Sequence, residues 1–398
     1  MKHSVNVRRH DIMQRVRDEM SRFDSPIVIA LRANNNELIL PGLHIHLASS
    51  FGFCDGVRHA LEVSLAALYA FPQKRVYLIG KIIHNSVVNK YLEEKGVLPI
   101  PNDSKSELYE QLTPEDVVII PAFGISTELR QRLEERNVLL VDSTCGNVIK
   151  VWHKVRAYAA EGVTSIIHGK PQHEESIATM SHARGKNGTG HYLVLRGEQE
   201  ASRVADYICN GGDRSRFLND MSGCYSPGFD PDTHLLCIGM ANQTTMLKKE
   251  SLRIQDILRQ AIIARDGTDK RFHGFNTICN ATQDRQEALL KILNTQNISA
   301  MIVIGGYDSS NTTHLAMLSS SRLPTYYIKD ASCIHTLGHV TSYQPECRKE
   351  ITTSLPPEAH APHGVWHVGI TAGASCPASC IEEVIRRLVE LRSEALNV

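Results

Sequence analysis

Short apolar segments typical of β-strands alternate with amphipathic helical segments along most of the chain, and this order constrains the fold more than any other feature. In the first third, the strand RVYLIG leads into a helical segment and then into further strands. The middle third repeats this plan from NVLLVDSTC, and the last third repeats it from FNTIC. Strands that alternate with helices favour an α/β fold with a largely parallel sheet.

Length and composition limit the function classes. The 398 residues allow two or three domains, and 42% hydrophobic with 22% charged residues describes a soluble globular protein. Lys plus Arg and Asp plus Glu both number 43, so no overall charge attracts nucleic acid or an anionic membrane. No run approaches the roughly 20 apolar residues of a membrane-spanning helix. The N-terminus lacks the apolar core of a secretory signal, so we expect a cytoplasmic protein, with a plastid or another organelle as the alternative.

The pattern also predicts local structure and domain boundaries. Residues 1–40 read as an N-terminal extension, with a charged helix at 11–22 and a strand at 26–31. Residues 209–234 are rich in Gly, Asp and Ser and predict a long surface loop. After the extension, we predict α/β domains at 41–141, 142–268 and 269–398, the last with a C-terminal segment.

Three cysteines occupy equivalent places, because Cys54, Cys145 and Cys279 each lie between a predicted strand and the start of a helix. The start of a helix favours negative charge, so each thiol is a candidate ligand or nucleophile. Three thiolates suit a [4Fe–4S] cluster with one open iron, or zinc with water as fourth ligand. Three scattered buried thiols also need no metal at all. The cysteines are far apart in the sequence, so a shared site requires three lobes with pseudo-threefold symmetry.

Polar side chains follow the other predicted strands, at the edge where open α/β sheets bind ligands. The candidates are His84, Phe123, His173, Glu175, Gln243, Thr244, Ser309, Ser310, Asn311 and Ser375. Imidazoles, hydroxyls and helix-start amides suit a diphosphate without Lys or Arg, and Glu175 is a candidate general acid. The alternatives are structural histidines and an exposed surface acid.

Eight motifs between positions 43 and 389 carry a resemblance to a known family. They are FGFCDGV, IIHNSVVNKYLEEKGV, VDSTC, IIHGKPQHEESIATM, ANQTTML, FNTICNATQDRQEA, GGYDSSNTTHL and GITAGAS. Together they resemble the 4-hydroxy-3-methylbut-2-enyl diphosphate reductase (IspH or LytB) family. Several motifs look like the plant and cyanobacterial branch.

The resemblance implies three α/β domains in a pseudo-threefold arrangement around a central [4Fe–4S] cluster, held by Cys54, Cys145 and Cys279. It implies reductive dehydroxylation of the substrate to isopentenyl and dimethylallyl diphosphate, the last step of the methylerythritol phosphate pathway of isoprene biosynthesis. The implied diphosphate ligands are His84, His173, Ser309, Ser310, Asn311 and Ser375. Glu175 is implied as the proton source, with Gln243 and Thr244 orienting the substrate hydroxyl. Ferredoxin is the implied electron donor, with flavodoxin as the alternative.

Some positions depart from the family pattern. Phe123 replaces a histidine of the bacterial branch, Gly146 replaces a proline, and Asp55 places a carboxylate beside the first cysteine. An acidic residue of the family is replaced by Ala378 and Ser379. Two other functions therefore stay open, an iron–sulfur hydro-lyase of the quinolinate-synthase kind and a non-catalytic cluster-binding paralogue.

Overall fold

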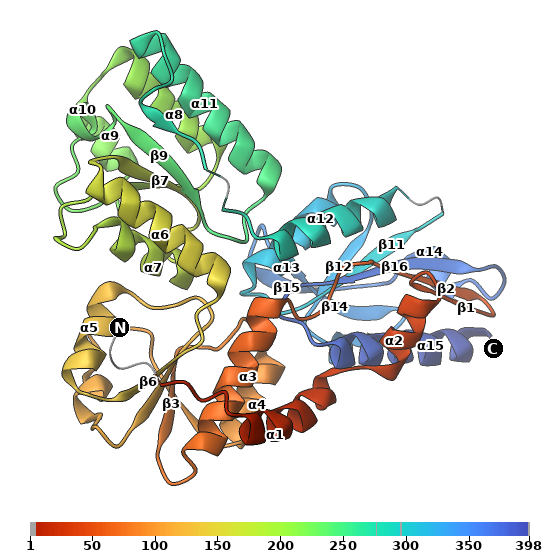
Figure 1. Ribbon diagram of the computed structural model, residues 1–398. Coiled ribbons are helices and arrows are strands. Elements are labelled where there is room, and N and C mark those ends of the chain that lie inside the picture. Colours follow the sequence, from red (N-terminus) through yellow and green to blue (C-terminus); the bar gives the residue numbers. More distant parts are fainter. Residues whose placement is uncertain (1–4, 276, 295–296, 397–398) are drawn as a thin grey trace. The chain divides into compact units, whose positions relative to one another are not determined.

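The computed structural model describes residues 5–275, 277–294 and 297–396, which form two compact units. The first unit comprises Ala67–Ile82 and Gly96–Cys279, together with the N-terminal residues through Val7. The second comprises Arg8–Ala66, Ile83–Lys95 and the chain from Asn280 onward. Parallel sheets flanked by helices occur in both units (Figure 1), so the predicted α/β class is confirmed. No helix among the described residues is long and apolar enough to cross a membrane.

The first unit contains two four-stranded parallel sheets. One has the order β4-β3-β5-β6, and the other has the order β10-β9-β7-β8. The strands of the first are β3 (Val76–Ile79), β4 (Val97–Ile100), β5 (Val117–Ile120) and β6 (Leu139–Asp142). Those of the second are β7 (Thr164–His168), β8 (Tyr192–Leu195), β9 (Ile238–Asn242) and β10 (Phe272–His273).

Helices cover both faces of the β7–β10 sheet, whose central strands β7 and β9 are buried along their whole length. Figure 1 shows α8 (Glu198–Asn210) and α11 (Lys248–Asp266) side by side on one face. The other face carries α6 (Gly146–Ala160) and α7 (Glu174–Ala183). In the first sheet of this unit, the shorter helix α5 (Thr127–Glu135) connects β5 to β6. Connections of this kind place strand ends and helix starts at one edge of a sheet.

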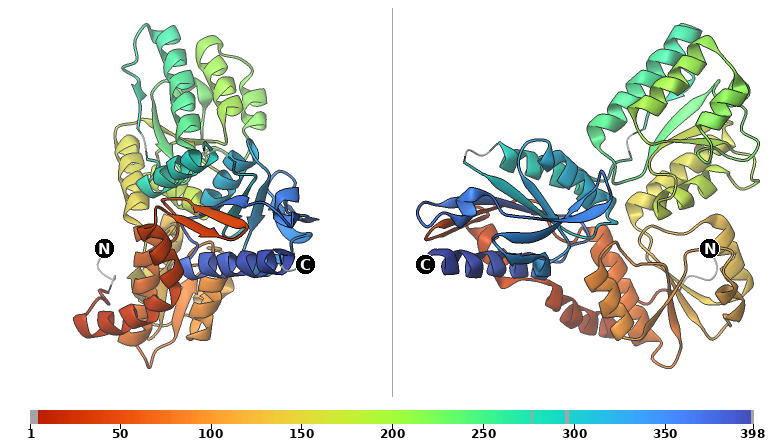
Figure 2. Two further views of the ribbon diagram at one scale, coloured as in Figure 1. Left: turned by 90° about the vertical axis from the view of Figure 1, so that its right-hand side faces the viewer. Right: turned by 180° about the vertical axis from the view of Figure 1, so that it is seen from behind.

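The second unit is built on a five-stranded sheet with the order β1-β2-β16-β11-β12. Its strands are β1 (Glu37–Leu40), β2 (Leu43–Leu47), β11 (Ala300–Ile304), β12 (Thr325–Ile328) and β16 (Trp366–Ala372). Figure 2 shows α15 (Ala378–Leu396) along one face of this sheet, where it shares a core with the sheet and with α2 (Pro26–Ala33). The opposite face packs against α12 (Asn280–Leu293) and α13 (Ser310–Ser320).

The second unit contains further elements besides this sheet and its helices. They include helix α1 (His10–Met20), helix α4 (Ser86–Glu94) and helix α3 (Asp55–Ala70), most of which belongs to this unit. Three short strands also belong to it. Those strands are β13 (Ile334–Thr336), β14 (His339–Gln344) and β15 (Lys349–Thr353), which form an antiparallel sheet. Short helices and turns complete the described chain: η1 (Ser21–Phe23), η2 (Glu107–Gln111), α9 (Arg214–Asp220), α10 (Pro231–His234), η3 (Ala331–Cys333) and α14 (Pro357–His360).

The same strand order occurs in all three larger sheets. When the parallel strands of the three sheets are numbered along the chain from β3, β7 and β11, respectively, their order across each sheet is second, first, third, fourth. In the second unit the fourth place belongs to β2, which comes from the start of the chain and pairs with β16. This repeat supports the prediction of three α/β lobes, while the boundaries predicted at 40, 141 and 268 stay predictions.

Three local predictions were wrong. Residues 26–31, predicted as a strand, lie in the helix α2 (Pro26–Ala33), because Ser25 caps its start and Pro26 stands at its first position. The strand expected at 275–278, directly before Cys279, is absent at 275, 277 and 278, while residue 276 lies outside the described residues; the strand that precedes this segment is the two-residue β10. Part of the predicted surface loop at 209–234 forms α9 and α10, because Phe217 of α9 enters the core and Pro231 of α10 is buried.

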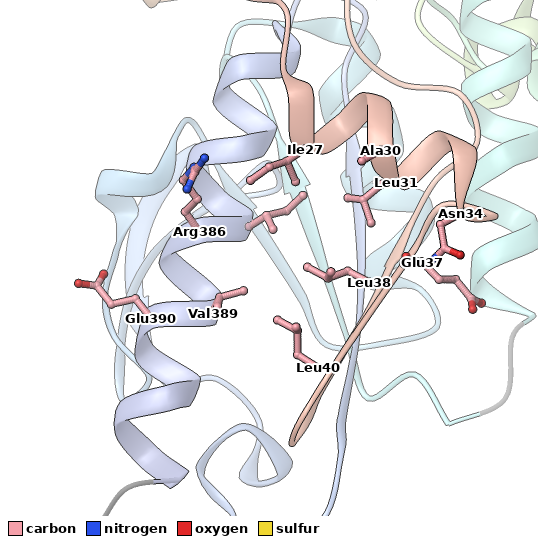
Figure 3. Close-up of a pocket in the computed structure, with 11 residues that line it drawn as sticks. Ile27, Ala30, Leu31, Asn34, Glu37, Leu38, Leu40, Arg386, Val389 and Glu390 are labelled. Atoms are coloured by element: carbon pink, nitrogen blue, oxygen red, sulfur yellow. Dashed lines mark hydrogen bonds between the residues drawn. The ribbon is translucent and has the colours of Figure 1, made fainter.

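An open apolar groove lies between α2, β1 and α15 in the second unit. Its volume is about 600 Å³, and Figure 3 shows Leu31, Leu38 and Val389 among the side chains that line it. None of the residues predicted to bind a substrate or a cofactor lines this groove.

Candidate active site

The predicted site residues follow particular strands of the repeated sheets. Each of the three cysteines follows the fourth strand of its sheet: Cys54 follows β2, Cys145 follows β6 and Cys279 follows β10. The loops predicted to bind ligands instead follow the first or the third strand of a sheet. These two strands are neighbours, and the order of the strands changes direction between them. In open α/β sheets, ligands bind outside the carboxyl ends of the strands at that reversal.

In the first unit, Glu175 lies in the first turn of α7, in the loop region after β7, and is 2% exposed. Its Oε1 accepts a hydrogen bond from the Thr244 amide nitrogen at 2.6 Å. Its Oε2 accepts a second from the Thr244 hydroxyl at 3.0 Å. The two residues meet because β7 and β9 are neighbours with His168 opposite Asn242. The predicted acid is therefore buried and held by two bonds, so its alternative as an exposed surface acid was wrong.

Gln243 and Cys279 belong to the same group of side chains. The Gln243 Oε1 atom accepts hydrogen bonds from the Lys170 amide at 3.1 Å and the Ser176 hydroxyl at 3.3 Å. The Cys279 amide donates to the Thr244 carbonyl oxygen at 3.2 Å. The third cysteine, the predicted acid and the loop predicted to orient the substrate hydroxyl are thus connected through Thr244.

Cys145 and His173 are also positioned within the first unit. Cys145 is the N-cap residue of α6, and its amide donates to the Ala122 carbonyl oxygen at 3.0 Å. His173 caps α7, where its Nδ1 accepts from the Glu175 amide at 3.2 Å. The Phe123 ring meets the His173 ring edge to face, with centroids 5.7 Å apart. Phe123 therefore supports an imidazole, although it cannot itself bind an anion.

A second layer of polar contacts holds the end of β7. The buried His168 imidazole makes a 2.7 Å hydrogen bond with Ser251 through Nδ1. Its Nε2 lies 3.7 Å from the Glu250 carboxylate. Burial, followed by the nearby Glu198 charge, raises the pKa of Glu250 above its ordinary value. These contacts fix the strand from which the Glu175 loop begins.

In the second unit, three predicted diphosphate ligands are gathered at the start of α13. Ser309 caps the helix, and Ser310 and Asn311 form its first turn, all at most 4% exposed. The Asn311 Oδ1 atom accepts from the Ala374 amide at 2.9 Å. The Ser310 hydroxyl and the Asn311 Nδ2 group are buried and find no hydrogen-bond partner among the described residues. Buried donors without partners at a helix start fit an anionic ligand.

His84 and Ser375 complete the polar group of the second unit. The Ser375 hydroxyl donates to the His84 carbonyl oxygen at 3.1 Å. The His84 Nδ1 atom lies 3.5 Å from Asp308 Oδ2. The backbones of Gly306 and His84 can lie close together only because Gly306 has no side chain: a Cβ atom at position 306 would lie 2.4 Å from the His84 carbonyl oxygen. Asp308 was not among the predicted site residues, although it stands inside the quoted motif GGYDSSNTTHL.

The three cysteines fit an iron–sulfur cofactor by their chemistry and placement. Cys54 precedes α3, and its amide donates to the Ala374 carbonyl oxygen at 3.1 Å, next to Ser375. Cys54, Cys145 and Cys279 are all half-buried and outside any disulfide bond, and each stands directly before a helix. Partly exposed thiols at helix starts are suited to be thiolate ligands.

Comparison with known proteins identifies the family. The LytB protein family model matches residues 45–389. The chain belongs to the LytB family. Curated relatives of this LytB-family chain carry the name 4-hydroxy-3-methylbut-2-enyl diphosphate reductase. The one from Thermosynechococcus vestitus is 40% identical over 94% of this chain and 91% of its own length. The one from Nostoc is 39% identical with the same coverage.

Solved structures agree with this family assignment. A structure of (E)-4-hydroxy-3-methyl-but-2-enyl diphosphate reductase is 28% identical and has a TM-score of 0.53. The match covers 87% of this chain and 99% of that one. A second, from Plasmodium falciparum, has a TM-score of 0.61 at 21% identity and supports the fold. The cyanobacterial relatives agree with the branch predicted from the sequence motifs.

Proposed function

We propose that this LytB-family chain catalyses the reductive dehydroxylation of 4-hydroxy-3-methylbut-2-enyl diphosphate to isopentenyl and dimethylallyl diphosphate. The shared name of its relatives supports this oxidoreductase reaction. The observation that carries the proposal is the buried Glu175 carboxylate bound to Thr244, on the loop that also holds the Cys279 amide. A proton donor next to a cofactor ligand is what this reaction requires, because a hydroxyl group must leave as water.

The cofactor of the proposal is a [4Fe–4S] cluster held by Cys54, Cys145 and Cys279, around which the three lobes would be arranged with pseudo-threefold symmetry. Such a cluster supplies two electrons, one at a time, and an open iron for the substrate. Each cysteine is fixed through its own backbone amide, which bonds to a neighbouring carbonyl oxygen. The protein therefore contributes placement and proton delivery.

Diphosphate binding is assigned to His84, His173, Ser309, Ser310, Asn311 and Ser375. The strongest support comes from the Ser310 hydroxyl and the Asn311 Nδ2 group, whose burial without partners costs free energy that a bound anion would recover. The start of α13 adds backbone amides and the positive end of the helix dipole.

Proton delivery is assigned to Glu175 through Thr244. A proton on Glu175 Oε2 would be donated to Thr244 Oγ1 along the 3.0 Å contact between them. The Thr244 hydroxyl can then donate its own proton to the leaving group. Gln243 is held by Lys170 and Ser176, and we assign it to orienting the substrate hydroxyl with Thr244.

The proposal includes an electron donor and a compartment. Ferredoxin is the proposed donor, in keeping with the cyanobacterial relatives, and flavodoxin is the alternative. We place the reaction in the cytoplasm, with a plastid or another organelle as the alternative. The donor can be tested by reconstituting the purified chain with each reduced protein and comparing the turnover rates.

The deciding experiment uses protein purified without air. We expect a brown protein that consumes the diphosphate substrate with an artificial reductant and forms both isomeric products, followed by mass spectrometry. A colourless protein after anaerobic reconstitution would contradict the cofactor assignment. Turnover without any reductant would instead indicate a hydro-lyase, and cluster binding without turnover would indicate a non-catalytic paralogue. Cys347→Ser, at an exposed cysteine, is the matched control for serine variants of the three ligands.

Electron paramagnetic resonance and Mössbauer spectra test the open iron directly. We expect the spectrum of one iron to change when the diphosphate substrate is added. Zinc bound by three cysteines would give neither spectrum, because Zn²⁺ has a filled d shell without unpaired electrons and the Mössbauer spectrum arises from iron alone.

A further inference from the structure

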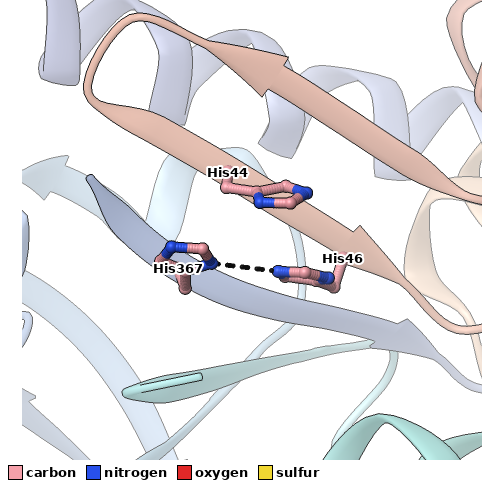
Figure 4. A group of neighbouring side chains, drawn as sticks. All are labelled: His44, His46 and His367. Carbon is pink, nitrogen blue, oxygen red and sulfur yellow. Dashed lines mark hydrogen bonds between the residues drawn. The ribbon is translucent and has the colours of Figure 1, made fainter. Parts of the chain in front are cut away.

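Three histidines of the second unit lie together on the five-stranded sheet, away from every residue assigned above. His44 and His46 come from β2, and His367 comes from the neighbouring strand β16 (Figure 4). One nitrogen from each imidazole can be chosen so that all three lie within 4.8 Å of one another. A carboxylate, Glu37 on β1, stands beside them.

The strand register explains why these side chains share one face. His44 and His46 are two positions apart, so they point to the same side of β2. His367 is directly opposite His44 in the parallel pairing of β16 with β2. Glu37 is directly opposite His46 in the antiparallel pairing of β1 with β2. Three adjacent strands therefore deliver one carboxylate and three imidazoles to the same patch.

The contacts within the patch resemble those of a metal-binding histidine cluster. His46 Nε2 lies 3.2 Å from His367 Nδ1, close to the roughly 3.3 Å between two ligand atoms of a tetrahedral zinc site with 2.0–2.1 Å bonds. The other nitrogen of His46, Nδ1, lies 3.4 Å from Glu37 Oε1. A carboxylate behind a histidine fixes its tautomer and points its other nitrogen at a metal.

Burial and charge favour a cation at this patch. His46 is 8% exposed, whereas His44 and His367 are half-buried, so an ion can reach them from solvent. The buried His44 Nε2 makes no hydrogen bond among the described residues and lies 3.5 Å from Glu37 Oε2.

We propose that His44, His46 and His367 bind a divalent transition-metal cation of the Zn²⁺ class, with Glu37 as the outer carboxylate. Imidazole nitrogens suit Zn²⁺, and a three-histidine set leaves one position for water or another ligand. Metal binding draws the three ligand nitrogens closer together. The imidazole rings of His44 and His46, which are stacked with centroids 4.0 Å apart, must then lose part of their stacking. The site uses no cysteine, and it stands whether or not the proposed reductase reaction does.

The test uses the cluster-loaded protein without air, so that the cysteines are occupied. After treatment with a chelator, the protein is dialysed against Zn²⁺ alone, and bound zinc and iron are both measured. We expect one zinc per chain, with zinc-edge X-ray absorption showing nitrogen and oxygen neighbours at about 2.0 Å. Sulfur neighbours at about 2.3 Å would place the zinc at cysteines and overturn the proposal. Failure of the wild-type protein to retain zinc would overturn it as well.

Variants connect the bound zinc to these residues. His44→Ala and His367→Ala should each weaken zinc binding at least tenfold, and Glu37→Gln should weaken it about tenfold or more. The control is His339→Ala, an exposed histidine of β14 that also pairs with another imidazole, that of His335. Unchanged binding in His44→Ala and His367→Ala would overturn the proposal. If His44→Ala or His367→Ala fails to fold, judged by circular dichroism and iron content, His44→Gln or His367→Gln takes its place.

Discussion

Glu175 accepts two hydrogen bonds from a single residue, Thr244, through the amide nitrogen at 2.6 Å and the hydroxyl at 3.0 Å. The Thr244 carbonyl oxygen in turn accepts a bond from the Cys279 amide at 3.2 Å. One residue thus joins the buried acid to a proposed cofactor ligand. A change at the acid should be separable from a change at the cofactor, because Thr244 meets Cys279 through its backbone carbonyl oxygen and meets Glu175 through its amide and hydroxyl groups.

Glu175→Gln should lower turnover about 10²–10⁴-fold, the usual contribution of a general acid. The glutamine keeps the size of the side chain and an oxygen that can accept from Thr244, so iron content and melting temperature should stay near those of the wild type. Single-turnover kinetics with reduced protein measure the effect. Glu174→Gln changes the neighbouring, less buried acid and should retain activity. Equal activity of Glu175→Gln and wild type would refute the assigned role.

Thr244→Val should slow turnover about tenfold while leaving the backbone bond to Glu175 in place. Valine has nearly the shape of threonine but lacks the hydroxyl that would pass a proton from Glu175 Oε2. Thr244→Ser restores a hydroxyl at the same place and should recover most of the lost rate. Measured kcat values of the two variants decide the point: a serine variant as slow as the valine variant would indicate a packing effect instead of proton transfer.

Ser310→Ala should weaken substrate binding about tenfold without reducing stability. The Ser310 hydroxyl is buried without a partner among the described residues, so its loss removes a donor for the diphosphate but breaks no bond within the protein. Isothermal titration with the diphosphate substrate and thermal unfolding measure the two effects. Ser320→Ala, at the exposed end of α13, is the control. A variant that binds normally but unfolds more easily would contradict the assignment.

Sequence patterns predicted most strands and the loops that carry the candidate site. This succeeded because buried parallel strands are short apolar runs, and because polar side chains directly after such strands lie at one edge of the sheet. The helix starts directly after Cys54, Cys145 and Cys279 agree with the prediction. Residues 26–31 were mistaken for a strand because their β-branched side chains resemble one, while the Ser25 cap and Pro26 signal a helix start.

Contacts between distant segments could not be predicted in the same way. The bonds between Glu175 and Thr244 depend on β7 and β9 being neighbours, a fact set by strand order and absent from either local sequence. The histidine patch could not be predicted from local sequence either. His44 and His46 stand at alternate positions of one strand, but His367 joins them only through the pairing of β2 with β16. The alternation of His44 and His46 along a predicted strand is the local signal that could have drawn attention to it.

Asp116→Asn should lower the melting temperature at neutral pH by roughly 5 °C, because it breaks the bidentate ion pair that the buried Asp116 makes with the exposed Arg75. Asp116 accepts from Arg75 at 2.7 and 2.9 Å, and from the Thr113 amide at 2.8 Å. Burial alone would raise the pKa of Asp116, but the bonds from Arg75 and Thr113 outweigh it and hold the pKa below its ordinary value.

A carboxylate with a lowered pKa adds stability above its unfolded pKa, near 4, and loses that contribution as the pH falls through the lower folded value. The difference in melting temperature between wild type and Asp116→Asn should therefore be full at pH 6–7 and shrink steadily below about pH 4. Thermal unfolding across this range measures it, with Asp103→Asn, at an exposed aspartate of the same unit, as the control. A difference that is constant down to pH 2.5 would show that Asp116 stabilises the fold by its shape and hydrogen bonds, and that its charge adds nothing.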